Sequence, residues 1–135
     1  MSTATAAAPA NARTATDLAA RVDDLVSYIR AGRILEAMRE FYADDVSMQE
    51  NNNPPTVGLE ANYAREEQFV SSVKQWKSLN VEAVAVDRQR GKTLVQLNFE
   101  FDAVDGKALK YDQVAVQTWR DGRIVHEKFY YDTGK

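Results

Sequence analysis

Apolar and polar positions alternate through the second half of the chain, as they do in β-strands. The dipeptides Arg90-Gly91, Asp105-Gly106 and Asp121-Gly122 separate runs rich in β-branched and aromatic residues, and an Asp-Gly pair accepts the positive φ angles of a two-residue hairpin turn. The predicted strands cover Leu79–Asp87, Thr93–Ala103, Ala108–Arg120 and the run after Gly122. We therefore predict a four-strand antiparallel meander in the C-terminal half.

The first half of the chain instead repeats its apolar residues at helical spacing. The first predicted helix begins at Asp17 and ends before Gly32. The second follows Gly32 and ends at Asp44-Asp45, and the third runs from Leu59 to Trp76. A short extended piece, Val46–Glu50, follows the second helix. The next five residues are three asparagines and two prolines, which disfavour helix interiors and predict a loop.

Three helices followed by a meander predict an α+β fold in which the helices cover one face of a curved sheet. The strand Ala108–Arg120 is longer than usual, and such strands normally bend, often at a β-bulge. A bent sheet under helices makes a cone with an opening. We expect residues 1–16 to form a flexible tail, and residues 17–135 to form a single domain.

Composition narrows the possible chemistry. The 135 residues contain no cysteine and one histidine, which excludes disulfides, thiolate zinc sites and multi-histidine metal sites within one chain. The net charge of -3 and the lack of a basic stripe argue against a nucleic-acid partner. No apolar run is long enough to span a membrane, and no cofactor-binding motif is present, so we expect a cytoplasmic protein without metal or cofactor.

The order of elements, FYADDV near the end of the second predicted helix, and WRDGRIVHEKFYYD near the C-terminus resemble the nuclear transport factor 2-like superfamily. Within it, the chain is most similar to SnoaL-like polyketide cyclases and ketosteroid-isomerase-like proteins. The resemblance implies a cone-shaped, cystatin-like fold with a pocket between helices and sheet. It also implies a homodimer built through the outer face of the sheet. Members include isomerases, hydrolases, dehydratases, cyclases and proteins that only bind.

The resemblance implies one position of a general base. In steroid-isomerase-like members the base lies six residues beyond the first aspartate of an ADD-type motif, which here leads from Asp44 to Glu50. The two hydrogen-bond donors of those enzymes would fall at Leu25 and Ala115, and neither side chain can donate. Glu50 is therefore a candidate base in an apolar cone, with a solvated residue at a loop edge as the alternative.

Glu127 is the second candidate carboxylate because it lies within an apolar alternation of the last strand. Buried carboxylates usually have a partner or a function. Glu127 could be an acid or base of the site, or it could form a salt bridge with Arg65 or Arg39. The neighbouring His126 has the opposite parity, which predicts an exposed or interface position.

Two registers of the strand Ala108–Arg120 remain open. Strict alternation places Val114 and Phe99 on the face of Glu127, whereas a bulge in this strand would turn Tyr111 and Gln113 toward the cavity. The resemblance favours the bulged register. The predicted ligand-binding residues are Tyr28, Tyr63, Asn98, Glu100, Tyr111, Gln113, Phe129 and Tyr131.

Three functions are consistent with these patterns. The first is a domain that binds a small organic ligand in an enclosed pocket, without an assigned reaction. The second is a cofactor-independent isomerase, dehydratase or cyclase with Glu50 as general base and Glu127 as second acid or base. The third is a dimerisation or scaffold module that works through the exposed face of the sheet, with Trp119 and Tyr130.

Overall fold

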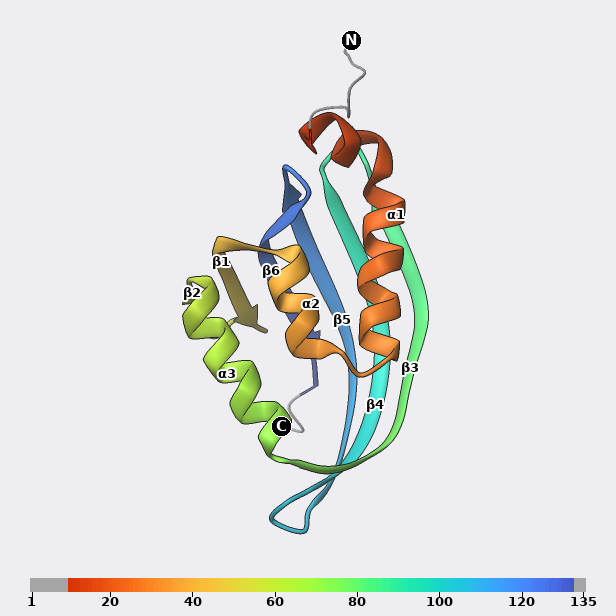
Figure 1. Cartoon of the computed structure of the whole chain (residues 1–135). Helices are drawn as coiled ribbons and strands as arrows, with labels where there is room; N and C mark the ends of the chain where they lie inside the picture. Colours follow the sequence, from red (N-terminus) through yellow and green to blue (C-terminus); the bar gives the residue numbers. More distant parts are fainter. Residues whose placement is uncertain (1–9, 133–135) are drawn as a thin grey trace.

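The structure, a computed structural model, describes residues 10–132 and the side chains of residues 17–132. Its helices are α1 (Ala10–Arg30), α2 (Ile34–Phe41) and α3 (Leu59–Ser71). Its strands are β1 (Tyr42–Glu50), β2 (Thr56–Val57), β3 (Val73–Asp87), β4 (Lys92–Ala103), β5 (Ala108–Arg120) and β6 (Arg123–Tyr131). One open sheet has the order β2-β1-β6-β5-β4-β3, and the three helices lie on one of its faces (Figure 1).

The predicted antiparallel meander is confirmed, but the predicted sheet is wrong in its number of strands, because it has six and not four. The four long antiparallel strands are present, but β1 and β2 extend the sheet to six strands, and β1 runs parallel to β6. Asp44 and Asp45 lie inside β1 and do not end a helix. The reason is local burial: Tyr42, Ala43 and Val46 are all buried, and an extended backbone places them against the core while the two aspartates stay exposed.

The third helix ends five residues earlier than predicted, at Ser71. Trp76, the last residue of the predicted helix, belongs to β3 and pairs with Phe101 of β4. Its ring packs against those of Phe101 and Phe69, with centroids 5.4 and 6.1 Å away. Packing of these large aromatic side chains outweighs the helical periodicity of the segment.

The register between β4 and β5 differs from both predicted registers. Ala103 N–H donates to the carbonyl of Lys107, so three residues form the Asp105-Gly106 turn and not two. One extra residue in the turn moves every β5 side chain to the other face. The register of β4 with β5 has no irregularity, and the bulge lies instead in β6 at Val125, between the pairs Trp119–Ile124 and Thr118–His126.

The hydrophobic core lies between the helices and the inner face of the sheet. Leu18, Val22 and Leu25 of α1 are almost completely buried there, as is Phe41 of α2. Each such side chain contributes about 1.5–3 kcal/mol by leaving water. The helix α1 begins at Ala10, and residues 1–9 of the predicted tail lie outside the described residues.

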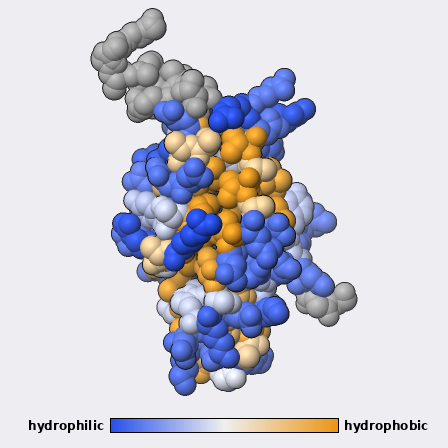
Figure 2. Space-filling model, turned by 90° about the vertical axis from the view of Figure 1, so that its right-hand side faces the viewer, coloured by the Kyte–Doolittle hydropathy of each residue, from blue (hydrophilic) through white to orange (hydrophobic). Residues whose placement is uncertain are grey.

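No helix of the described residues lies on the outer face of the sheet (Figure 1). Its larger apolar side chains include Leu94, Val114, Val116 and Tyr130, which keep partial contact with solvent. Trp119, predicted for this face, is instead buried on the inner face beside Ile124. Figure 2, which looks at the side of the molecule where β3 lies in Figure 1, shows apolar side chains gathered in a band along that side. Within residues 10–132, no helix combines the length and apolar composition that crossing a membrane requires.

Candidate functional site

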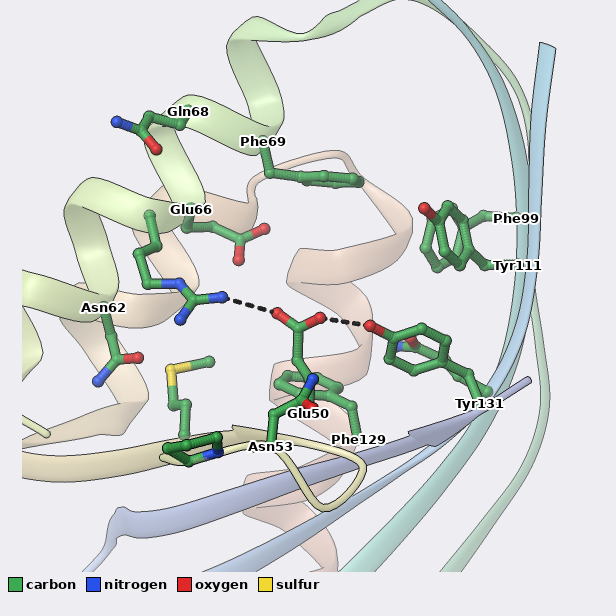
Figure 3. Close-up of a pocket in the computed structure, with 14 residues that line it drawn as sticks. Glu50, Asn53, Asn62, Glu66, Gln68, Phe69, Phe99, Tyr111, Phe129 and Tyr131 are labelled. Atoms are coloured by element: carbon green, nitrogen blue, oxygen red, sulfur yellow. Dashed lines mark hydrogen bonds and ion pairs between the residues drawn. The ribbon is translucent and has the colours of Figure 1, made fainter. Parts of the chain in front are cut away.

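A cavity of about 560 Å³ opens between α3, the end of β1 and the inner face of β4, β5 and β6. Figure 3 shows the side chains that surround it. Its walls consist of Met48, Glu50, Asn53, Pro54, Asn62, Arg65, Glu66, Gln68, Phe69, Phe99, Tyr111, Gln113, Phe129 and Tyr131. A smaller inner chamber of about 120 Å³ shares part of this wall and reaches Glu127 and the helices α1 and α2.

Glu50, the predicted base, lies in the cavity wall at the end of β1. One of its carboxylate oxygens accepts a hydrogen bond from the Tyr131 hydroxyl, and the other forms an ion pair with Arg65 Nη2 at 3.0 Å (Figure 3). The Arg65 guanidinium also donates to Thr56 Oγ1 at 2.6 Å. Burial and the Glu50 carboxylate together raise the pKa of Tyr131 to about 12. Both oxygens of Glu50 are therefore engaged within the protein.

Glu66 is a second carboxylate of the cavity wall, and unlike Glu50 it has no hydrogen-bond donor or ion-pair partner among the described residues. It projects from α3 into the open space in Figure 3 and makes no hydrogen bond or ion pair with any other described residue. Burial raises its pKa to about 7, and the negative charges of Glu127 and Glu50 act in the same direction. A carboxyl group with this pKa can both hold and release a proton near neutral pH.

Sequence reasoning missed Glu66, although a signal was present. Asn62, Glu66 and Phe69 follow one another at spacings of four and three residues, so they share one face of α3. The prediction used only the apolar members of this stripe. A carboxylate on a helix face that is otherwise buried indicates a partner or a function, as it did for Glu127.

Glu127 is buried, with 3% of its surface exposed, and neutral donors surround it. The Tyr42 hydroxyl donates to Oε1, and Gln117 Nε2 donates to Oε2 at 2.7 Å. The predicted alternative of a salt bridge is wrong, because Arg65 pairs with Glu50 and Arg39 pairs with Glu60. Burial raises the pKa of Glu127, while the two hydrogen bonds act against that shift.

Two further polar groups of β5 line the cavity without a partner among the described side chains. The Tyr111 hydroxyl and the Gln113 amide stand two residues apart on the inner face, and no hydrogen bond of either group joins it to the described residues. Tyr111 points into the cavity in Figure 3, across the open space from Glu66. The site thus combines one unpaired carboxyl group on α3 with two unpaired hydrogen-bonding groups on β5.

Half of the predicted ligand-binding residues line the cavity: Tyr111, Gln113, Phe129 and Tyr131. Tyr111 and Gln113 face inward because of the three-residue turn, and the predicted bulge in β5 is absent. Asn98 and Glu100 were predicted to accompany them and instead lie on the outer face, where Asn98 donates to Glu82 at 2.8 Å. The same register places Phe99 inside the cavity and leaves Val114 outside.

The two remaining predicted tyrosines pack away from both chambers. The rings of Tyr28 and Phe41 are nearly perpendicular, with centroids 5.2 Å apart, and the Arg33 guanidinium lies over the Tyr28 ring. The guanidinium of Arg39 lies over the ring of Tyr63, 3.8 Å from its centroid. Both therefore serve the packing of helices.

His126 lies on the outer face, as its parity predicted, and its Nδ1 is 2.6 Å from Ser47 Oγ. Within the described part of the chain, no three histidine, aspartate or glutamate side chains converge as a metal site would require.

Comparison with known proteins finds a matching family and several similar solved structures. Residues 15–127 match the family of SnoaL-like domains. A solved structure of a proposed SnoaL-like polyketide cyclase from Mesorhizobium loti, also described as a carbohydrate phosphatase, is similar with a TM-score of 0.73 and 22% identity. The match covers 84% of this chain and 98% of that chain.

Two other solved structures are similar at lower identity. A nuclear transport factor 2-like protein from Burkholderia pseudomallei has a TM-score of 0.70 and 16% identity, over 89% of this chain and 92% of that one. A proposed isomerase from Bacillus subtilis has a TM-score of 0.69 and 14% identity, over 90% and 88%. These likenesses show the fold. A comparison with curated proteins found no match.

Proposed function

The chain belongs to the family of SnoaL-like domains, within the nuclear transport factor 2-like superfamily, and from this premise we propose that its cavity binds a small, partly polar organic molecule. The observation that carries the proposal is the composition of the cavity wall. Glu66, Tyr111 and Gln113 present polar groups that have no partner among the described residues to a space whose wall also contains the rings of Phe69, Phe99, Phe129 and Tyr131. Convergent polar groups in an apolar hollow are typical of ligand sites.

The size of the cavity supports the same proposal. Its volume of about 560 Å³ lies within the range of about 300–1,000 Å³ that is usual for small-molecule sites. The inner chamber of about 120 Å³ extends this space toward Glu127. A molecule with one or two rings and a few polar atoms matches these dimensions.

Binding can be tested with 2-naphthol, a neutral aromatic probe, by following amide resonances in NMR spectra. We expect saturable shifts at residues that line the cavity. A Gln113→Trp substitution fills the cavity and should abolish them, whereas Gln96→Trp, on the exposed outer face, should leave them unchanged. Shifts that persist in Gln113→Trp, or that never saturate in the wild type, would contradict the proposal.

A second candidate function is cofactor-independent proton transfer, and the state of Glu66 favours it. A carboxyl group with a pKa of about 7 is suited to general acid–base catalysis at neutral pH. Tyr111 and Gln113 are placed to donate hydrogen bonds to a carbonyl oxygen across the cavity. Glu50, the base that the sequence predicted, is less suited because Tyr131 and Arg65 occupy its oxygens. Similar structures are called polyketide cyclase and isomerase, which agrees with this class of reaction.

The proton-transfer candidate can be tested with 2-tetralone, an enolisable ketone, by following deuterium uptake at its α-carbon in D₂O. General-base catalysis predicts an acceleration that Glu66→Gln lowers by about 10²–10⁴-fold. Glu67→Gln changes the same charge at the exposed neighbouring position and serves as the control. Equal exchange rates in the two variants would remove Glu66 from this role.

We also propose that two copies of the chain associate through the outer face of the sheet. Leu94, Val114, Val116 and Tyr130 form an apolar surface there that no element within residues 10–132 covers. Apolar surfaces of this kind commonly mark protein contacts. Such a dimer leaves the cavity open, because the cavity lies on the opposite face of the sheet.

A further inference from the structure

We propose that the ligand of this cavity is an organic cation, an amine or a quaternary ammonium compound, with Glu66 as its counter-ion and the rings of Phe69, Tyr111 and Tyr131 as its walls. The inference rests on the binding function proposed above and names the chemical class of the ligand. It differs from the second candidate function, in which a neutral carbonyl compound would lie beside Glu66.

The charges around the cavity are the first observation. Arg65 is the cationic side chain of the wall, and it is already paired with Glu50 and hydrogen-bonded to Thr56. Glu66 and, in the inner chamber, Glu127 have no cationic partner among the described residues. The field within the cavity is therefore negative, which favours a cation and opposes carboxylates, phosphates and other anions.

The arrangement of aromatic rings is the second, independent observation. The rings of Phe99 and Tyr111 are stacked, with centroids 5.2 Å apart and an angle of 24°. Phe69 meets Phe99 at 79° and 6.3 Å, and Tyr131 meets Tyr111 at 78° and 5.7 Å. The rings thus form three walls at nearly right angles around the space that Glu66 faces (Figure 3).

An ammonium group in this space would meet aromatic rings on three sides and a carboxylate on the fourth. Aromatic rings attract cations through the negative potential of their faces, and several rings around one cation form the usual site for methylated ammonium groups. The carboxylate of Glu66 adds a direct ion pair. A neutral molecule of the same shape lacks both interactions and should bind more weakly.

The ionisation of Glu66 couples this binding to pH. The groups that face it are Glu50 from β1, Glu127 from β6, Arg65 from its own helix, and the tyrosines of the cavity. Burial and the two carboxylates raise its pKa to about 7 in the free protein, so the group is ionised at pH 8 and protonated at pH 5.5. A primary amine stays protonated at both values. Its affinity should therefore rise as the pH increases through 7.

The test compares 3-phenylpropylamine with 3-phenylpropan-1-ol, a neutral molecule of nearly the same shape, by NMR titration of the full chain. At pH 8 we expect the amine to bind roughly tenfold more tightly than the alcohol. At pH 5.5 the preference should fall to the smaller part that the aromatic rings contribute. The Glu66→Gln variant should show the same reduced preference at both pH values, and Glu67→Gln should behave as the wild type.

The outcomes separate the inference from the function on which it rests. Equal affinities for the two probes at pH 8, or a preference for the amine that is undiminished in Glu66→Gln, would overturn the cation site while ligand binding stands. Failure of both probes and of 2-naphthol to bind would overturn the binding function itself. A Tyr111→Leu variant removes one aromatic wall and should lower the affinity for the amine more than that for the alcohol.

Discussion

Gln117 Nε2 lies 2.7 Å from Glu127 Oε2, and both side chains are almost completely buried. The orientation of this amide is fixed from its other end. The indole N–H of Trp119 donates to Thr93 Oγ1, so the Thr93 hydroxyl donates its own hydrogen to Gln117 Oε1. The NH₂ group must then point to Glu127. This chain of hydrogen bonds holds the carboxylate at the wall of the inner chamber without a positive charge.

A Gln117→Leu substitution should therefore destabilise the fold strongly. It leaves the Thr93 hydroxyl without its acceptor and the buried carboxylate of Glu127 with a single donor, Tyr42. We expect a loss of about 2–4 kcal/mol in the free energy of unfolding, measured with urea at pH 7. Gln89→Leu, in the exposed turn between β3 and β4, should change it by less than about 0.5 kcal/mol. A loss of the same size in both variants would exclude this network as the cause.

Local patterns were sufficient to predict most elements of the fold, but not the register between strands. The turn at Asp121-Gly122 has the predicted two residues, and both take positive φ angles. The turn at Asp105-Gly106 contains one residue more, Val104, and this single residue determines that Tyr111 faces the cavity. The alternation of side chains within one strand does not show how that strand is aligned with its neighbour, because the alignment depends on the turn between them and on tertiary packing.

The site was predicted in part for a similar reason. Glu50 and Glu127 were identified from a family motif and from an apolar alternation, and both line one of the two chambers. Glu66 was not predicted because only the apolar residues of its helix were considered. Glu50 is hydrogen-bonded to Tyr131 and Arg65, which are distant from it in the sequence. The pattern of residues within one segment cannot predict such contacts.

Glu50→Gln should lower the pKa of Tyr131 from its value of about 12. Burial is the main cause of the raised pKa, and the hydrogen bond and charge of Glu50 follow. We therefore expect a decrease that stops above the ordinary value of 10. NMR titration of ring-labelled tyrosine measures it, and Glu100→Gln, on the outer face, should leave the value unchanged. An unchanged pKa in Glu50→Gln would mean that burial alone accounts for the shift.

The proposed dimer predicts different effects for two valine substitutions. Val116→Lys places a charge within the apolar outer face, whereas Val104→Lys places it in the exposed turn between β4 and β5. We expect sedimentation velocity to show a dimer for the wild type and for Val104→Lys, and a monomer of unchanged circular dichroism for Val116→Lys. A wild type that remains monomeric at high concentration would contradict the dimer.

The stability of the protein should depend on pH through Glu66. Its pKa is about 7 in the folded protein and near 4.5 when unfolded, so the folded state holds its proton more tightly. The resulting stabilisation is complete below pH 4.5 and is lost as the pH rises through 7, by about 2–3 kcal/mol. Glu66→Gln removes this dependence.

Urea unfolding between pH 4 and pH 8 measures the effect. We expect Glu66→Gln and the wild type to differ little near pH 4, and the variant to be more stable by about 2–3 kcal/mol at pH 8, where the wild-type carboxylate is ionised without a partner. Glu67→Gln, with the same change of charge at an exposed position, should retain the pH dependence of the wild type. The difference between the two variants therefore reports Glu66 together with its interaction with the neighbouring carboxylates Glu50 and Glu127. A constant difference across this pH range would show that the Glu66 carboxyl group titrates at its ordinary pKa.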